Sequence, residues 1–191
     1  MNPKLTEQTI NLVNGQVCKI EIIDCPTESD WLKVKQRALV TCGKTMVNPP
    51  TSEWKRKILL ARHSPIRKLN FSFYLSDIPY WLSTELCRHH EGCEKYVKSQ
   101  RNDRQESYDR NEAYQNAPVN MIWDFNAESL MTIASKRLCG KATKEAQQVM
   151  GTMAALAEMS CPEFKGMFRT PCGWTGKCYE METCGRTEEI K

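Results

Sequence analysis

The chain has 191 residues, of which 40% are apolar and 26% charged, a length and balance that predict one globular domain with its own core. No apolar run of about 18 residues occurs, so we expect no membrane span, and residues 1–10 lack the apolar segment of a secretory signal, which predicts a cytoplasmic protein. The net charge of +4 is too small to indicate direct nucleic-acid binding, although it suits a small phosphorylated ligand.

The first part of the chain predicts two strands separated by two helices. Residues 16–24 place apolar side chains among polar ones and predict a strand. Ser29 is expected to cap a helix that runs to about residue 40, and Thr51 a second helix that runs to about residue 61. Residues 69–75 alternate apolar and polar side chains, as a half-buried strand does.

A helix followed by a loop is expected in the middle of the chain. Asp77 and Pro79 are suited to starting this helix, one by capping and the other by its preset backbone angle. The apolar spacing continues through His89, which should therefore face inward, and Gly92 is expected to end the helix. Residues 102–120 are polar and without clear period, which predicts a loop.

Two helices are expected next, from Asn126 to about residue 138 and from Thr143 to about residue 159. In the first of them, Arg137 and Asn126 fall on the apolar stripe that contains Ile133. A permanent charge on that stripe needs a partner. The partner is either an acidic residue of the chain, or water that the guanidinium reaches, or a ligand whose cavity both residues line, roughly 16 Å apart along the helix.

Basic residues gather where the predicted helix at Gly92 ends. Arg88, His89 and His90 are consecutive, and Arg101 follows after a short interval. Arginine offers a planar fork of donors that suits phosphate. Clustered cations at a helix end also compensate the helix dipole, so a solvated charged stretch remains the alternative to a ligand site.

In order and spacing, these residues resemble the signature of the flavin-dependent thymidylate synthases, the ThyX family. Arg88-His89-His90 followed by Ser99 and Arg101 is similar to that family's arginine-histidine-arginine, serine and arginine motif. Further matching pieces, in chain order, are His63-Ser64, the strand with Phe71 and Phe73, Asn126-Ala127, and Arg137 eleven positions after Asn126. The resemblance covers roughly residues 54 to 155.

The resemblance implies a role for each matching residue. The residues that would bind FAD are Arg88, His89, His90 and Asn126. The residues that would bind dUMP are Glu85, Arg88, Ser99, Gln100, Arg101 and Arg137. Among these Arg137 would be catalytic, because it would grip the pyrimidine ring and stabilise negative charge on it.

The family's fold and activity are likewise implied by the resemblance. The expected fold is α+β, a small antiparallel sheet flanked by several helices, assembled as a homotetramer with active sites shared between subunits. The expected reaction is reductive methylation of dUMP to dTMP. Methylenetetrahydrofolate, the folate partner, would supply the carbon and reduced FAD the hydride, with NADPH restoring the flavin.

Some positions depart from the family pattern. His90 and Glu128 stand where the family has arginine, Glu85 stands where it has glutamine, and one extra residue separates Arg88 from Ser99. These departures would fit a divergent member of the kind found in viruses and phages, acting in the host cytoplasm. Two other functions stay open: hydroxymethyl transfer to a pyrimidine nucleotide on the same scaffold, and a non-catalytic zinc-binding module.

The cysteines are concentrated near the C-terminus. Of 10 cysteines, four lie after residue 160, namely Cys161, Cys172, Cys178 and Cys184. We therefore divide the chain into a synthase-like domain, residues 1–160, and a cysteine-rich appendage, residues 161–191. Four thiolates could bind a structural zinc ion tetrahedrally. No Cys-x-x-Cys pair is present, so a set of reduced thiols or an oxidation-sensitive tail is the alternative.

Overall fold

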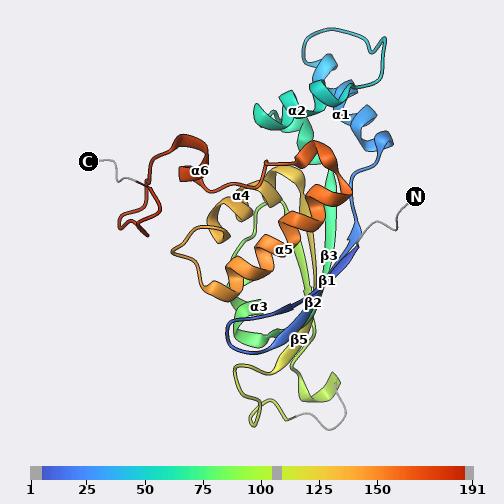
Figure 1. The fold of residues 1–191 in the computed structure, drawn as a ribbon. Coiled ribbons are helices and arrows are strands. Elements are labelled where there is room, and N and C mark those ends of the chain that lie inside the picture. Colours follow the sequence, from blue (N-terminus) through green and yellow to red (C-terminus); the bar gives the residue numbers. More distant parts are fainter. Residues whose placement is uncertain (1–5, 105–108, 188–191) are drawn as a thin grey trace.

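A five-stranded antiparallel sheet organises the protein, seen in a computed structural model that describes residues 6–104 and 109–187 (Figure 1). The strand order is β1-β2-β3-β5-β4. The strands are β1 (Glu7–Asn11), β2 (Val17–Asp24), β3 (Asn70–Pro79), β4 (Cys93–Val97) and β5 (Pro118–Asn126). The expected α+β class with a small antiparallel sheet and flanking helices is confirmed.

The long helix α5 (Lys144–Ser160) crosses one face of the sheet, contacting β1 and β2, while α4 (Ala127–Arg137) contacts β3 and β5 (Figure 1). The two central strands alternate between this face and the other, so that Phe73, Trp123 and Phe125 are buried. The Trp123 and Phe125 ring centroids are 4.5 Å apart. Each such side chain contributes about 1.5–3 kcal/mol on burial, which fixes the register of β3 and β5 beneath α4.

The N-terminal helices begin close to their predicted positions. Helix α1 (Glu28–Val40) is capped by Thr27, whose side chain forms a capping box with Asp30. The expected cap, Ser29, lies inside the first turn instead, because the reciprocal pair requires a spacing of three residues. Helix α2 (Ser52–Leu60) is capped by Thr51 as expected.

Helix α3 (Tyr80–Leu86) is shorter at both ends than the apolar spacing predicts. Asp77 does not cap it but lies within β3 with φ of 59°, where the ladder between β3 and β5 shifts register. The helix ends before His89, which lies in the turn that leads to β4. Gly92, with φ of 65°, makes the left-handed residue of that turn.

Three strands are additional to the predicted ones: β1, β4 and β5. The loop expected over 102–120 accordingly ends early, since β5 begins at Pro118. It contains one short 3-10 segment, η2 (Asn102–Arg104), among the described residues. In Figure 1 the segment between β4 and β5 projects from the end of the sheet.

The segment directly after α5 packs into the core. A 3-10 turn, η3 (Pro162–Phe164), buries Phe164, and Met167 and Phe168 are buried after it. A further 3-10 turn, η1 (Ser64–Lys68), precedes β3, and the short helix α6 (Pro171–Thr175) lies in the tail. The division of the chain at residue 160 stays a prediction, but the residues directly after it share the core of the preceding ones.

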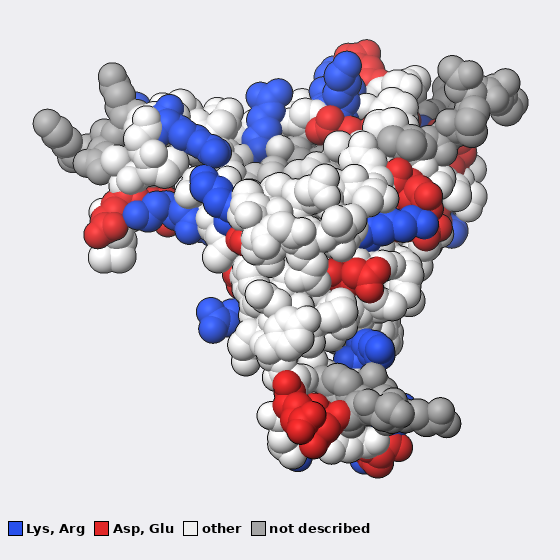
Figure 2. All heavy atoms as spheres, turned by 60° about the horizontal axis from the view of Figure 1, so that its bottom comes forward, with Lys and Arg blue, Asp and Glu red and all other residues white. Residues whose placement is uncertain are grey.

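The surface carries both signs of charge. On the face shown in Figure 2, lysine and arginine are interspersed with aspartate and glutamate. This distribution accords with the net charge of +4. Among the helices that the structure describes, none has the length and apolar character needed to cross a membrane.

Candidate functional site

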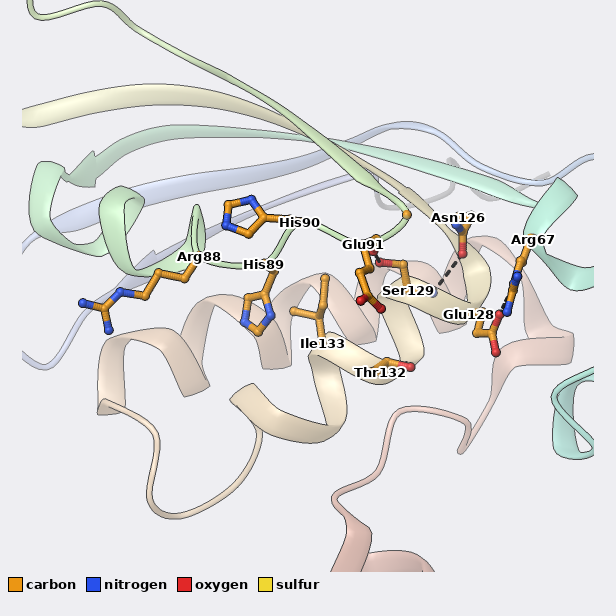
Figure 3. Close-up of a pocket in the computed structure, with 11 residues that line it drawn as sticks. Arg67, Arg88, His89, His90, Glu91, Asn126, Glu128, Ser129, Thr132 and Ile133 are labelled. Carbon is orange, nitrogen blue, oxygen red and sulfur yellow. Dashed lines mark hydrogen bonds and ion pairs between the residues drawn. The ribbon is translucent and has the colours of Figure 1, made fainter. Parts of the chain in front are cut away.

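A cavity of about 630 Å³ lies between the turn after α3 and the first half of α4 (Figure 3). Its lining comes from three segments that the fold brings together: η1, the turn before β4, and α4 with its cap. The lining residues are Arg67, Arg88, His89, His90, Glu91, Gly92, Asn126, Glu128, Ser129, Thr132 and Ile133. Four of them, Arg88, His89, His90 and Asn126, are the predicted FAD ligands.

One end of this cavity is cationic. The side chains of Arg88 and His90 are exposed there, and neither makes a hydrogen bond or ion pair with the described part of the chain. In Figure 3, Arg88, His89 and His90 lie at one end of the cavity and Asn126 and Arg67 at the other. An unpaired guanidinium at the wall of a cavity can bind an anionic group such as a phosphate.

The other end of the cavity is fixed by backbone and cap contacts. The Asn126 side chain caps α4 by accepting from the Ser129 backbone N–H at 2.9 Å. The Asn126 backbone N–H donates to the carbonyl of Gly92 at 2.9 Å. A Cβ atom on residue 92 would lie 2.2 Å from Nδ2 of Asn126, so only glycine permits this approach of the turn to the helix.

Glu128, which stands where the resembling family has arginine, is paired within the chain. The Arg67 guanidinium forms an ion pair with the Glu128 carboxylate across the cavity wall. The carboxylate is thereby neutralised, and it does not leave an isolated negative charge in the cavity. Spacing in the sequence gives no signal for this pair, since the two residues are 61 positions apart.

Arg137 points inward as predicted, and its partner is an acidic residue of the chain. Its guanidinium forms an ion pair with Glu85, whose side chain is 17% exposed, and donates to the Glu85 backbone carbonyl at 3.2 Å. Its Nε donates to Nε2 of His89 at 2.8 Å. The Thr143 hydroxyl donates to the second Glu85 oxygen at 2.9 Å. Arg137 therefore lies behind His89, beside the cavity rather than in its lining.

His89 is held in its neutral form. Burial and, secondarily, the positive charge of Arg137 lower the pKa of its imidazole from 6.5 to about 4. Because Nε2 accepts from Arg137, any proton on the neutral ring is on Nδ1. The ring also lies 6.4 Å from that of Trp123, with an interplanar angle of 27°, so the sheet supports its orientation.

Ser99, Gln100 and Arg101, which were predicted to bind the nucleotide phosphate, lie outside the cavity beside α4 in a single chain. Gln100 and Arg101 line a separate cavity of about 430 Å³ with residues of the segment before β5. Arg101 forms a two-point ion pair with Asp103, at 2.9 and 2.6 Å, and the Ser99 hydroxyl accepts from the Arg101 backbone N–H at 3.3 Å. Arg88, Arg101 and Arg137 thus do not meet in one cleft of a single chain.

The four tail cysteines do not form one group. Cys161 is buried in the main core, where its thiol donates to the Pro26 carbonyl at 3.6 Å. Cys172, Cys178 and Cys184 line a small cavity, and the fourth thiol there belongs to Cys139. Among the described residues, no three or more histidine, cysteine or acidic side chains are placed to hold a metal ion. The predicted zinc set is therefore not assembled here, because Cys161 is directed into the core.

No family model and no curated protein matches the sequence. Solved structures do resemble the fold. One is thymidylate synthase X (ThyX) from Helicobacter pylori with FAD and dUMP, at 13% identity and a TM-score of 0.60, covering 78% of this chain and 96% of that one. Another, a flavin-dependent thymidylate synthase ThyX from the same organism complexed with FAD and dUMP, is 16% identical with a TM-score of 0.60, covering 78% and 97%. The chain thus has a ThyX-like fold.

Proposed function

We propose that this protein is a flavin-dependent methyltransferase that converts dUMP to dTMP with methylenetetrahydrofolate, FAD and NADPH. The observation that carries the proposal is the meeting of Arg88, His89, His90 and Asn126 at one cavity. The four residues come from two segments far apart in the sequence, and they are the ones that the family resemblance assigns to FAD. Solved proteins with this fold contain FAD and dUMP.

The chemistry of the cavity fits a flavin nucleotide. Its volume of about 630 Å³ is in the range of cofactor sites. Arg88 and His90 would hold phosphate groups at the cationic end, and Asn126 would contact the flavin at the other end, where Gly92 keeps its amide in place. Bound flavin would supply the hydride for the reaction.

Arg137 would act on the pyrimidine. A guanidinium beside a desolvated ring stabilises negative charge that develops as carbon 5 becomes nucleophilic, an effect worth about 2.7–4 kcal/mol per donor. Within the chain, the Glu85 carboxylate already forms an ion pair with this guanidinium. The nucleotide would therefore have to compete with Glu85 for Arg137, or bind to the donors that remain.

The nucleotide phosphate would be held by Ser99, Gln100 and Arg101. Since these residues lie outside the FAD cavity of their own chain, we propose that a second subunit supplies them, in the shared-site homotetramer that the resemblance implies. Arg101 would exchange Asp103 for phosphate on binding. The partners of the protein are then dUMP, the folate and further copies of this chain.

The visible absorption of the purified protein tests the flavin, and mass analysis of the product tests the reaction. With dUMP, methylenetetrahydrofolate, FAD and NADPH we expect dTMP. Arg88→Gln should bind FAD at least about tenfold more weakly, a loss of about 1.4 kcal/mol, whereas Arg104→Gln, at an exposed residue outside the cavity, should leave binding unchanged. A protein that neither retains flavin nor alters dUMP would refute the proposal.

The same assay separates the two alternative functions. A product heavier than dUMP by a hydroxymethyl group, formed equally well without NADPH, would identify a hydroxymethyltransferase instead. A protein that contains zinc and forms no product would identify the non-catalytic module.

A further inference from the structure

A second cluster of reactive groups lies outside the site described above. The cavity of about 110 Å³ beside α6 is lined by four thiols, those of Cys139, Cys172, Cys178 and Cys184. Cys139 comes from the connection between α4 and α5, and the other three come from the tail. All four are free thiols. The fold therefore brings the tail cysteines to a cysteine more than 30 positions earlier.

The side chain of Cys184 lies close to Gly140, the chain neighbour of Cys139. The Sγ of Cys184 lies 2.9 Å, and its Cβ 3.0 Å, from the place that a Cβ on residue 140 would occupy. The Cys184 side chain therefore lies against the residue next to Cys139, and both cysteines line the same small cavity. The absence of a side chain at Gly140 is what leaves room for the Cys184 sulfur.

Charged side chains hold the tail beside the connection. Lys136, Lys141 and Glu180 line the same cavity as the thiols. The Lys141 ammonium also forms an ion pair with Glu182 at 3.1 Å, and Arg186 donates to the Leu138 carbonyl at 3.4 Å. These contacts hold the tail beside the connection before any covalent bond forms.

We propose that Cys139 and Cys184 are an oxidisable pair that joins the tail to the α4–α5 connection by a disulfide. With hydrogen peroxide as the oxidant, the half-exposed Cys184 thiolate attacks the O–O bond and becomes a sulfenic acid, releasing water. The Cys139 sulfur then displaces the sulfenic oxygen as a second water. The protein loses two protons and two electrons, and one peroxide becomes two waters.

The bond would form close to Arg137, which is two residues before Cys139 in the chain. It would close a loop that contains all of α5 and η3. A covalent link of this kind lowers the entropy of the unfolded chain. In a compartment that keeps most thiols reduced, such a pair is a transient, redox-responsive modification.

Peptide mapping of the full-length protein tests the pair. The protein is treated with hydrogen peroxide, its remaining thiols are alkylated, and it is digested without reduction. We expect one main cross-linked species, joining the peptides of residues 139 and 184 and cleaved by dithiothreitol. Cys184→Ser and Cys139→Ser should each abolish it. Cys161→Ser and Cys42→Ser, which alter a core thiol and an exposed thiol outside the cavity, should leave it intact.

Cys184→Ser is the decisive variant, because Cys184 is half-exposed. Cys139 is buried, so its replacement also affects folding. Circular dichroism should show unchanged secondary structure in the Cys184 variant. Recovery of both cysteines in alkylated form after oxidation would overturn the proposal, as would a main cross-link between other cysteines. Thiols that resist peroxide until a chelator removes bound zinc would overturn it too.

Discussion

At the scale of single residues, the Glu85–Arg137 ion pair is the feature with the clearest consequence. Both side chains are less than one-fifth exposed. Arg137 also donates to His89, and the Thr143 hydroxyl donates to the Glu85 carboxylate. A guanidinium that is already paired is pre-positioned, but its charge is partly neutralised. Under the proposed function, Glu85 would therefore set how much of that charge acts on the pyrimidine.

We predict that Glu85→Gln strengthens dUMP binding by about fivefold to tenfold, at most about 1.4 kcal/mol. The amide keeps the shape and one acceptor oxygen but removes the competing charge. Isothermal titration of the flavin-loaded protein with dUMP measures the change. The control is Glu112→Gln, at an exposed residue of the projecting segment. Weaker binding in the Glu85 variant would show that the carboxylate assists the nucleotide instead.

Arg137→Ala should abolish turnover while flavin absorbance is retained, because Arg137 lies behind the cavity wall rather than in it. The variant leaves the Glu85 carboxylate without its cation, so some loss of stability is expected as well. Arg137→Ala combined with Glu85→Gln removes that cost. Wild-type rates in a folded double variant would remove Arg137 from the mechanism.

His89 makes the free energy of unfolding depend on pH in the acidic range. The folded chain holds the pKa of His89 at about 4, below the ordinary value of 6.5. The folded state therefore binds this proton less readily than the unfolded state. The stability that neutral His89 contributes to the fold is fully present above pH 6.5 and is lost as the pH falls toward 4. We predict that the Tm of His89→Gln falls less between pH 7 and pH 4.5 than that of the wild type. His90→Gln, at an exposed ring, should behave as the wild type.

At the scale of elements, the turn before β4 packs against the cap of α4, and this junction shapes the cavity proposed to bind FAD. We predict that Gly92→Ala destabilises the protein and weakens FAD binding, because its Cβ would displace the Asn126 amide. Gly43→Ala is a matched control: Gly43 has nearly the same φ, 64°, but nothing lies within 4 Å of its added Cβ. Both variants share the backbone strain of a left-handed alanine. Equal losses of Tm and FAD affinity in the two would assign the whole effect to strain.

Local sequence patterns predict some of the helices and strands but not all of them. The predicted helix starts at Thr51 and Asn126 are confirmed, and each residue caps its helix through the backbone N–H three positions later. Strand β5 has a regular alternation of buried side chains and could have been predicted from it. Strand β4 buries Cys93 alone, so its pairing with β5 is a property of the assembled sheet that no local pattern carries.

The same limit applies to the candidate site. The grouping of Arg88, His89, His90 and Asn126 followed from the family resemblance, and the inward direction of Arg137 followed from the helical period. The partners Glu85, Arg67 and Thr143 belong to tertiary contacts across at least 50 residues. The exchange of Cys161 for Cys139 in the thiol cluster has the same origin, since sequence spacing does not show which cysteines face the core.

At the scale of the whole molecule, the core extends beyond α5. Phe164 and Met167 are buried to 0% and 1% exposure, and Glu163 is an ion-pair partner of the buried Lys55 at 3.0 Å. We predict that a chain ending at residue 160 loses on the order of 5 kcal/mol from these side chains and fails to fold cooperatively. A chain ending at residue 170 should retain a sharp transition in thermal denaturation. A cooperative transition in the shorter chain would instead support an independent domain up to residue 160.

The connection between β4 and β5 has a consequence for how such a protein can diversify. The register between the two strands, Val97 opposite Met121, anchors both ends of the connection. Doubling the length of an anchored loop costs only about 0.6 kcal/mol. Insertions and deletions between these anchors can therefore accumulate over generations with little penalty to folding. Under the proposed function, such changes would alter the residues that hold the nucleotide phosphate and leave the cavity beside α4 unchanged.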